Sequence, residues 1–171
     1  LYNDSLISPE QIARVGQFAE NTYFGKPCGL MDQTASAVGG ILKIDFADPE
    51  ELEIQKVAFD VESTAYILMV IHTGSSHADL TSAYASIPME MKAVAQIMGA
   101  QVLRERSYEE FLDQSNDIRN QLGDRAVLRA HHFYSENLRV DRMVAALEGG
   151  DFEAYLANVR ASGYSSQNIL Q

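Results

Sequence analysis

Residues 27–40 read PCGLMDQTASAVGG, and they lie between the first helical pattern of the chain and its alternating segments. Glycines and a proline at positions 25–29 end the helical pattern before it, because these residues interrupt helices. The segment LMDQTASAV at 30–38 is short and rich in alanine, which is the strongest helix former. We therefore expect a short helix over 30–38 that ends at the glycine pair 39–40.

A single carboxylate, Asp32, stands near the start of this expected helix, and two explanations for it are open. An aspartate at a helix start stabilises the helix, because its side chain caps free backbone N–H groups. Alternatively, a carboxylate among Gly29, Met31 and small residues is partly desolvated and can take a proton from an attacking hydroxyl. A glycine at position 29 would also let a ligand approach the backbone closely.

Regular patterns flank this stretch on both sides. A helix is predicted over 8–24, where a capping serine and a proline precede apolar residues at helical spacing. The alternating segments ILKIDF (41–46) and LEIQKVAF (52–59) predict two strands that form a hairpin. The segment AYILMVIHT (65–73) is almost continuously apolar, which is typical of a buried central strand or a buried helix. Its β-branched and aromatic residues favour the strand.

The chain after Gly74 is predominantly helical in pattern. Ser107 and Glu110 form the spacing of a capping box, which begins a helix. Four helices are expected, from about 88 to 98, from 107 onward, over 124–147 and from 151 onward. Because antiparallel strands come first and helices follow, the pattern indicates an α+β class with a helix-rich second half.

Length and composition limit the possible classes of protein. The chain has 171 residues, 46% hydrophobic and 22% charged, which is typical of one globular domain, so we expect residues 1–171 to form one structural unit. A formal net charge of −11 argues against nucleic acid and membrane surfaces as partners. A single cysteine, Cys28, excludes an internal disulfide and fits a reducing, cytoplasmic setting. Since the chain begins with Leu1 and its pattern continues to Gln171, we expect a piece of a longer protein.

Other kinds of catalytic site have little support in the residues. The chain has no G-x-S-x-G, H-E-x-x-H, C-x-x-C or G-x-x-x-x-G-K-[ST] motif. His131 and His132 are adjacent, so on a helix they point about 100° apart and do not converge on one metal. His132 and Glu136 share a helix face, but that spacing favours a hydrogen bond or an ion contact over a metal site. We therefore expect no metal-binding residues in this chain.

Three segments resemble a known enzyme family. KPCGLMDQTASAVGG (26–40) is similar to the catalytic-aspartate segment of galactokinases, which belong to the GHMP superfamily of small-molecule kinases. IHTGSSHADLTSAY (71–84) resembles the stretch after the next strand of that family, which ends in Ser-x-Tyr. RAHHFYSENLRV (129–140) resembles the family's long-helix signature. The resemblance covers the chain from about Asn21 to Val140.

The resemblance implies a fold, an activity and three site residues. The fold would be GHMP-kinase-like, and the chain would be the central fragment of a two-lobed cytoplasmic kinase. The activity would be transfer of the γ-phosphate of ATP, with Mg²⁺, to the C1 hydroxyl of galactose. Asp32 would be the base that activates this hydroxyl, and Gly29 would touch the sugar through its backbone. Tyr84 would hydrogen-bond to the sugar or pack on it; without the resemblance, a tyrosine near the core explains it equally well.

The chain also departs from the family. Missing are the N-terminal sugar-binding segment with its catalytic arginine, the nucleotide loop and the C-terminal glycine-rich motif, so nucleotide-binding residues stay unknown and the fragment alone is expected to be inactive. ASIP (85–88) and RASGYSS (160–166) replace the family's usual Asn-Arg and Glu-Ser-His residues. Two alternatives therefore stay open. One is a sister GHMP kinase for N-acetylgalactosamine, arabinose or glucuronic acid, and the other is a galactokinase-like sensor that binds sugar and ATP without turnover. The oligomeric state is also open.

Overall fold

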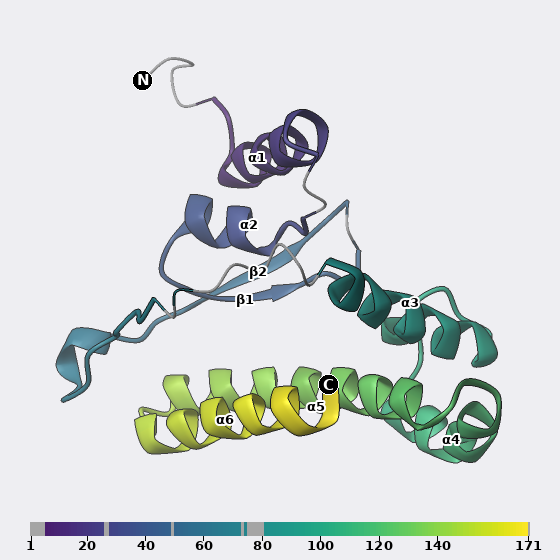
Figure 1. Cartoon of the computed structure of the whole chain (residues 1–171). Helices are drawn as coiled ribbons and strands as arrows, with labels where there is room; N and C mark the ends of the chain where they lie inside the picture. Colours follow the sequence, from purple (N-terminus) through teal and green to yellow (C-terminus); the bar gives the residue numbers. More distant parts are fainter. Residues whose placement is uncertain (1–5, 26–27, 49, 73, 75–80, 171) are drawn as a thin grey trace. The chain divides into compact units, whose positions relative to one another are not determined.

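The structure is a computed structural model of the whole chain, and it describes residues 6–25, 28–48, 50–72, 74 and 81–170. The chain divides into two compact units, Leu1–Phe59 and Asp60–Gln171. Figure 1 shows the helices and strands of both units. The expectation that residues 1–171 form one structural unit stays a prediction.

The described residues of unit 1 form two helices followed by a hairpin. Its elements are α1 (Pro9–Tyr23), α2 (Met31–Val38), β1 (Ile41–Asp45) and β2 (Glu53–Val57). The two strands pair antiparallel, from Ile41 opposite Val57 to Asp45 opposite Glu53. The predicted helices and the predicted hairpin of this unit are therefore confirmed.

Helix α1 begins with a capping serine, as the sequence predicts. The Ser8 hydroxyl accepts a hydrogen bond from the backbone N–H of Gln11 at 3.2 Å, and the Gln11 side chain accepts one from the Ser8 N–H at 2.9 Å. This capping box satisfies two backbone donors that would otherwise lack helical partners. Pro9 occupies the first turn, where its missing N–H does no harm.

Unit 2 contains most of the helices. The elements of its described residues are η1 (Val61–Ser63), α3 (Thr81–Ile97), η3 (Leu103–Glu105), α4 (Tyr108–Leu122), α5 (Asp124–Glu148), α6 (Phe152–Ser165) and the π-helical turn η4 (Ser166–Leu170). Helix α5 is the long element of this unit, and α6 and η4 pack along it (Figure 1). The predicted helices from Ser107, from Asp124 and from Asp151 are confirmed.

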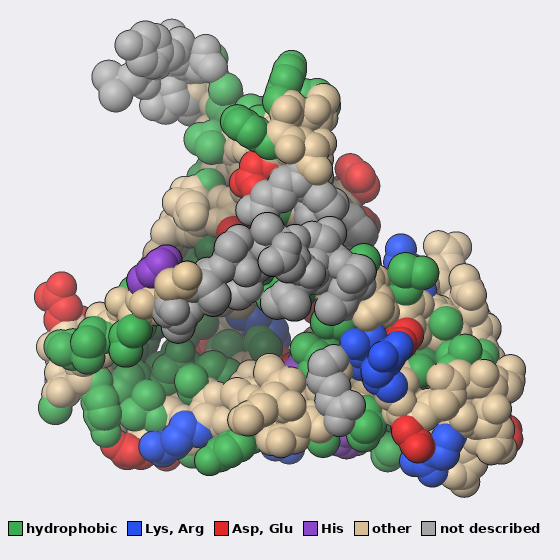
Figure 2. All heavy atoms as spheres, viewed as in Figure 1, with side chains coloured by type: hydrophobic (Ala, Val, Ile, Leu, Met, Phe, Trp, Pro, Cys, Tyr) green, Lys and Arg blue, Asp and Glu red, His purple; other side chains and the backbone are tan. Residues whose placement is uncertain are grey.

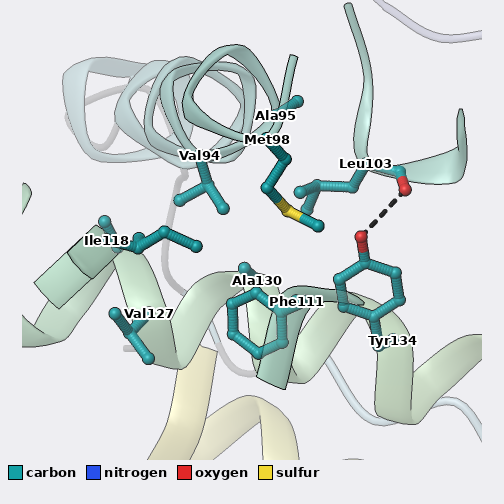
Figure 3. Close-up of a cluster of buried hydrophobic side chains, with 10 residues drawn as sticks. Val94, Ala95, Met98, Leu103, Phe111, Ile118, Val127, Ala130 and Tyr134 are labelled. Atoms are coloured by element: carbon teal, nitrogen blue, oxygen red, sulfur yellow. Dashed lines mark hydrogen bonds between the residues drawn. The ribbon is translucent and has the colours of Figure 1, made fainter. Parts of the chain in front are cut away.

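The hydrophobic core of unit 2 lies where α3, α4 and α5 meet (Figure 3). Phe111 and Ile118 of α4 and Val94 of α3 are almost completely buried there. Tyr134 of α5 enters the same cluster and donates a hydrogen bond from its hydroxyl to the Leu103 carbonyl at 3.0 Å. The buried phenol therefore keeps a polar partner, as buried hydroxyls require.

The strand or buried helix that we expected over 65–73 is wrong for its described part, residues 65–72. These residues have no regular secondary structure, and the side chains from Ile67 to Ile71 are 69–92% exposed. A strand forms only when neighbouring strands satisfy its backbone, and the sheet of the described residues consists of β1 and β2. The segment is attached to α6 through Tyr66, whose hydroxyl donates to Glu153 at 2.6 Å and whose ring packs on Phe152. Thr73 lies outside the described residues.

Helix α3 is longer than expected. We predicted a helix from about Pro88, whereas α3 begins at Thr81 and contains Pro88 in its interior. Proline is unfavourable inside a helix, because it lacks a backbone N–H and its ring clashes with the preceding turn. Arg129 of α5 contacts Ser86 before Pro88 and Glu90 after it. These contacts stabilise the helix on both sides of the proline.

In the part of the chain that the structure describes, the secondary structure is helix-rich with a two-stranded antiparallel sheet, which agrees with the expected α+β class. Within the described ranges, no helix has both the length and the apolar character needed to cross a membrane. Hydrophobic side chains nevertheless reach the surface of the molecule, as Figure 2 shows.

Candidate functional site

Asp32 is the second residue of α2 and lies in its first turn. The residue at the cap position is Leu30, which makes no side-chain capping bond. The Asp32 side chain is exposed, and among the described residues it has no hydrogen-bond or ion-pair partner. Asp32 therefore does not serve as the helix cap, although a negative charge in the first turn stabilises the helix. The partial desolvation that we expected from its neighbours is not found, since Met31 beside it is also 59% exposed.

Polar side chains of α1 hold the backbone just before α2. The Cys28 N–H donates to the Asn21 side chain at 2.9 Å, and the Cys28 carbonyl accepts from the Gln17 side chain at 3.2 Å. Gln33, which follows Asp32, donates to Glu20 at 3.0 Å and contacts the Cys28 sulfur at 3.4 Å. Together these bonds fix where α2 begins and thus where the Asp32 carboxylate is presented.

The support of Cys28 by polar side chains of α1 was not predicted from the sequence. The structure shows a half-buried cysteine whose backbone N–H and carbonyl both have side-chain partners. Gln17 and Asn21 are four residues apart, so they lie on one face of α1. That spacing is the signal from which a polar contact could have been predicted.

Gly29 lies two residues before α2 and is exposed. Its φ angle is not positive, and a Cβ atom built on it would meet no other described atom within 4 Å. Neither backbone conformation nor packing in the described chain therefore requires glycine at this position. The open space is compatible with the expected backbone contact to a ligand.

Tyr84 lies in unit 2, on α3, and is 56% exposed. Tyr84 is thus not among the buried residues of the unit 2 core, and the choice between a sugar contact and a structural position near that core stays a prediction. Gly29 and Asp32 lie together in unit 1, at the start of α2. A common site of Asp32 and Tyr84 stays a prediction.

The two adjacent histidines of α5 are engaged in separate contacts. His131 shares a hydrogen bond with the Tyr108 hydroxyl at 2.6 Å, and His132 shares one with the Ser165 hydroxyl at 2.9 Å. Burial lowers the pKa of His132 below its usual value, although the charge of Glu136 opposes this. These two side chains thus connect α5 to α4 and to α6.

Glu136 has its own partners, and its predicted direct contact with His132 is replaced by them. Its carboxylate accepts hydrogen bonds from Ser162 at 2.6 Å and from Arg139 at 2.8 Å. These bonds lower the pKa of Glu136 even though burial opposes the change. Within the ranges described, no three or more His, Cys, Asp or Glu side chains gather as a metal site.

A shallow depression of about 270 Å³ lies on the hairpin of unit 1. It does not include Gly29 or Asp32. Its lining residues are Lys43, Asp45, Glu53, Ile54 and Gln55. Because it is open and lies on a two-stranded hairpin, it does not enclose a ligand.

Comparison with known proteins bears directly on the catalytic-aspartate resemblance. The galactokinase of Glaesserella parasuis is 35% identical over 147 residues, which is 86% of this chain and 37% of that protein. The galactokinase of Streptomyces coelicolor is 34% identical over 158 residues, or 91% of this chain and 40% of that protein. The chain is a relative of galactokinases. The galactokinase of Homo sapiens is 32% identical over 143 residues, which is 84% of this chain and 35% of that protein.

The relatives also define the extent of the similarity. The chain spans 35–40% of the length of these galactokinases. No family model matches the chain. The matches to individual galactokinases confirm the expected resemblance over most of the chain.

Proposed function

We propose that the chain is part of a sugar kinase that transfers the γ-phosphate of ATP to the C1 hydroxyl of galactose. The observation that carries this proposal is the similarity to galactokinases over 82–91% of the chain. We further propose that residues 1–171 are the central part of a two-lobed, cytoplasmic kinase with the GHMP fold. This longer kinase is called the parent protein below.

In the proposed reaction, Asp32 accepts the proton of the C1 hydroxyl as its oxygen attacks phosphorus. The position of Asp32 supports this role, because its carboxylate is exposed and makes no hydrogen bond to the described residues. The hydrogen bonds around Cys28 hold the start of α2 and orient this carboxylate. Gly29 offers open space for the sugar beside the backbone, and Tyr84 is proposed to contact the same sugar.

ATP with Mg²⁺ would supply the transferred phosphoryl group and neutralise its charge. The described residues do not fit a complete site for this group, since they contain neither a metal-binding cluster nor a glycine-rich phosphate loop. We therefore assign no residue of the chain to ATP. We also propose that residues 1–171 alone have no kinase activity.

Substitution of Asp32 by Asn in the parent protein tests the proposal. We expect turnover with galactose to fall about 10²–10⁴-fold, because the amide cannot accept the proton, while ATP binding changes little. ADP release measures turnover, and calorimetry measures ATP binding. Glu109→Gln is a matched control, because Glu109 is also an exposed second residue of a helix, α4.

The outcome separates the alternatives. If Asp32→Asn keeps wild-type turnover, Asp32 is not the base and serves only the helix start. If the wild-type parent protein releases ADP with N-acetylgalactosamine, arabinose or glucuronic acid but not with galactose, a sister kinase is favoured. If the parent protein binds galactose and ATP without releasing ADP, the sensor is favoured.

A further inference from the structure

Pro88 divides helix α3 into two parts. It has no N–H, so it cannot donate to the carbonyl of Tyr84, which lies four residues earlier. The ring of an interior proline also pushes against that carbonyl. Helix α3 therefore lacks one of the backbone bonds that would join its first turns to the rest of the helix. Tyr84 lies on the N-terminal side of Pro88.

Arg129 of α5 contacts α3 on both sides of Pro88. Its Nη1 donates to the Ser86 hydroxyl at 2.9 Å and lies 3.1 Å from a carboxylate oxygen of Glu90. Ser86 precedes the proline and Glu90 follows it, one helical turn apart. One guanidinium group thus bridges the two parts of α3.

The Arg129 side chain is only 4% exposed, so this arrangement is costly unless each donor has a partner. Its Nε donates to the Leu170 carbonyl in η4 at 3.1 Å. The bonds to η4 and to α3 together fix the guanidinium in one orientation. Arg125 also pairs with Glu90, but its side chain is 60% exposed.

We infer that Arg129 is a positioning residue that holds the first turns of α3, and with them Tyr84, in place across Pro88. The inference about the fold depends on the contacts of Arg129 alone. Its consequence for the sugar rests on the proposed function, in which Tyr84 contacts galactose. A lysine cannot replace this arginine, because one ammonium group lacks the planar fork that reaches Ser86, Glu90 and the η4 carbonyl together.

Hydrogen exchange on the 171-residue chain tests the inference without any activity. In a helix the amides of residues 85–87 donate to the carbonyls of residues 81–83, so both ends of these bonds lie before Pro88. We expect Arg129→Met to speed their exchange at least about fivefold, the factor that corresponds to one ordinary hydrogen bond. Amides of α4 should change less. Arg125→Met is the matched control, because it removes a Glu90 partner without touching Ser86.

The Ser86→Ala variant is a second test, which can be used even if the Arg129→Met variant does not fold. It removes the hydroxyl that Arg129 contacts on the N-terminal side of Pro88 and leaves the ion pair of Arg129 with Glu90. We expect faster exchange at residues 85–87 and unchanged exchange beyond Glu90. If Ser86→Ala leaves the exchange of residues 85–87 unchanged, Arg129 does not hold this segment and the inference is overturned.

Kinetics of the parent protein test the consequence for the substrate. We expect Ser86→Ala to raise the KM for galactose several-fold and to leave the KM for ATP and kcat near wild type. If the wild-type parent protein does not phosphorylate galactose, the proposed function fails while the exchange result still stands. If the exchange changes but the KM for galactose does not, Tyr84 is held by Arg129 but does not contact the sugar.

Discussion

Tyr134 illustrates how burial changes the chemistry of a single side chain. It is 6% exposed, and its hydroxyl donates to the Leu103 carbonyl. Burial, together with the negative charge of Glu110, raises its pKa from 10.0 to about 12, although Arg106 opposes the change. The neutral phenol is the form that fits the core, because it can donate and because an ionised oxygen would lose its hydration.

This raised pKa makes stability depend on pH in a defined window. In the unfolded chain Tyr134 ionises near pH 10.0, whereas in the folded chain it stays protonated to about 12. Between these values the unfolded state binds fewer protons, so the free energy of unfolding falls as the pH rises. Urea unfolding at a series of pH values measures this loss. The Tyr134→Phe variant should show a shallower fall; an equal fall in both proteins would contradict the assignment.

Tyr84→Phe tests the proposed role of Tyr84 in the parent protein. Because Tyr84 is 56% exposed, removal of its hydroxyl should change the free energy of unfolding by less than about 1 kcal/mol. The KM for galactose should rise several-fold while the KM for ATP and kcat change little, since a contact made equally in both states affects binding alone. Steady-state kinetics with each substrate varied measures this split. Unchanged KM values would remove Tyr84 from the sugar site.

Local spacing predicted several elements, and it did so for a physical reason. The serines before α1 and α4 and the glycines at the ends of α2 and α5 act within one turn of the chain. The hairpin β1–β2 has its alternation and its turn within a short segment. Such features depend on neighbouring residues, so the sequence alone identifies them.

Elements that depend on distant residues were not predictable. The apolar pattern of residues 65–72 indicates burial but cannot say which residues would cover them. Helix α3 begins before the predicted position, because the contacts of Arg129 with Ser86 and Glu90 come from another helix. For the candidate site, spacing alone identified Asp32 as a possible base, whereas its assignment with Gly29 and Tyr84 depended on resemblance. The Cys28 contacts that support α2 have only a weak sequence signal.

The capping box of α4 offers a test of local stability. The Ser107 hydroxyl accepts from the Glu110 N–H at 3.1 Å, and the Glu110 carboxylate accepts from the Ser107 N–H at 2.7 Å. Ser107→Ala should lower the free energy of unfolding by about 1 kcal/mol, which is typical for the loss of an N-cap. Ser115→Ala, inside the same helix, is the control and should be nearly neutral because alanine is the better helix former. Equal effects of the two variants in denaturant unfolding would contradict a specific role for the cap.

At the scale of the whole molecule, the two units differ in how much apolar surface they bury. Unit 2 has a continuous core formed by three helices. Among the described residues of unit 1, the buried hydrophobic ones are Ala13, Leu30 and Val57, whereas Val15 and Phe18 of α1 are 66% and 59% exposed. Burial of apolar area supplies most of the stabilisation of a domain. Unit 1 therefore has the smaller share of that stabilisation per residue.

The exposed run Ile67–Ile71 has a consequence for the 171-residue chain in solution. The run has five consecutive apolar residues, without charge or proline, that belong to no strand. Such a segment can pair with the same run in other molecules and form cross-β aggregates. The net charge of −11 slows this self-association but does not remove the segment that nucleates it. Met69→Asp should delay the appearance of thioflavin-positive aggregates, whereas Met89→Asp, with the same 69% exposure on α3, should not. Equal delay by both variants would show that added charge, and not this segment, governs the solubility of the chain.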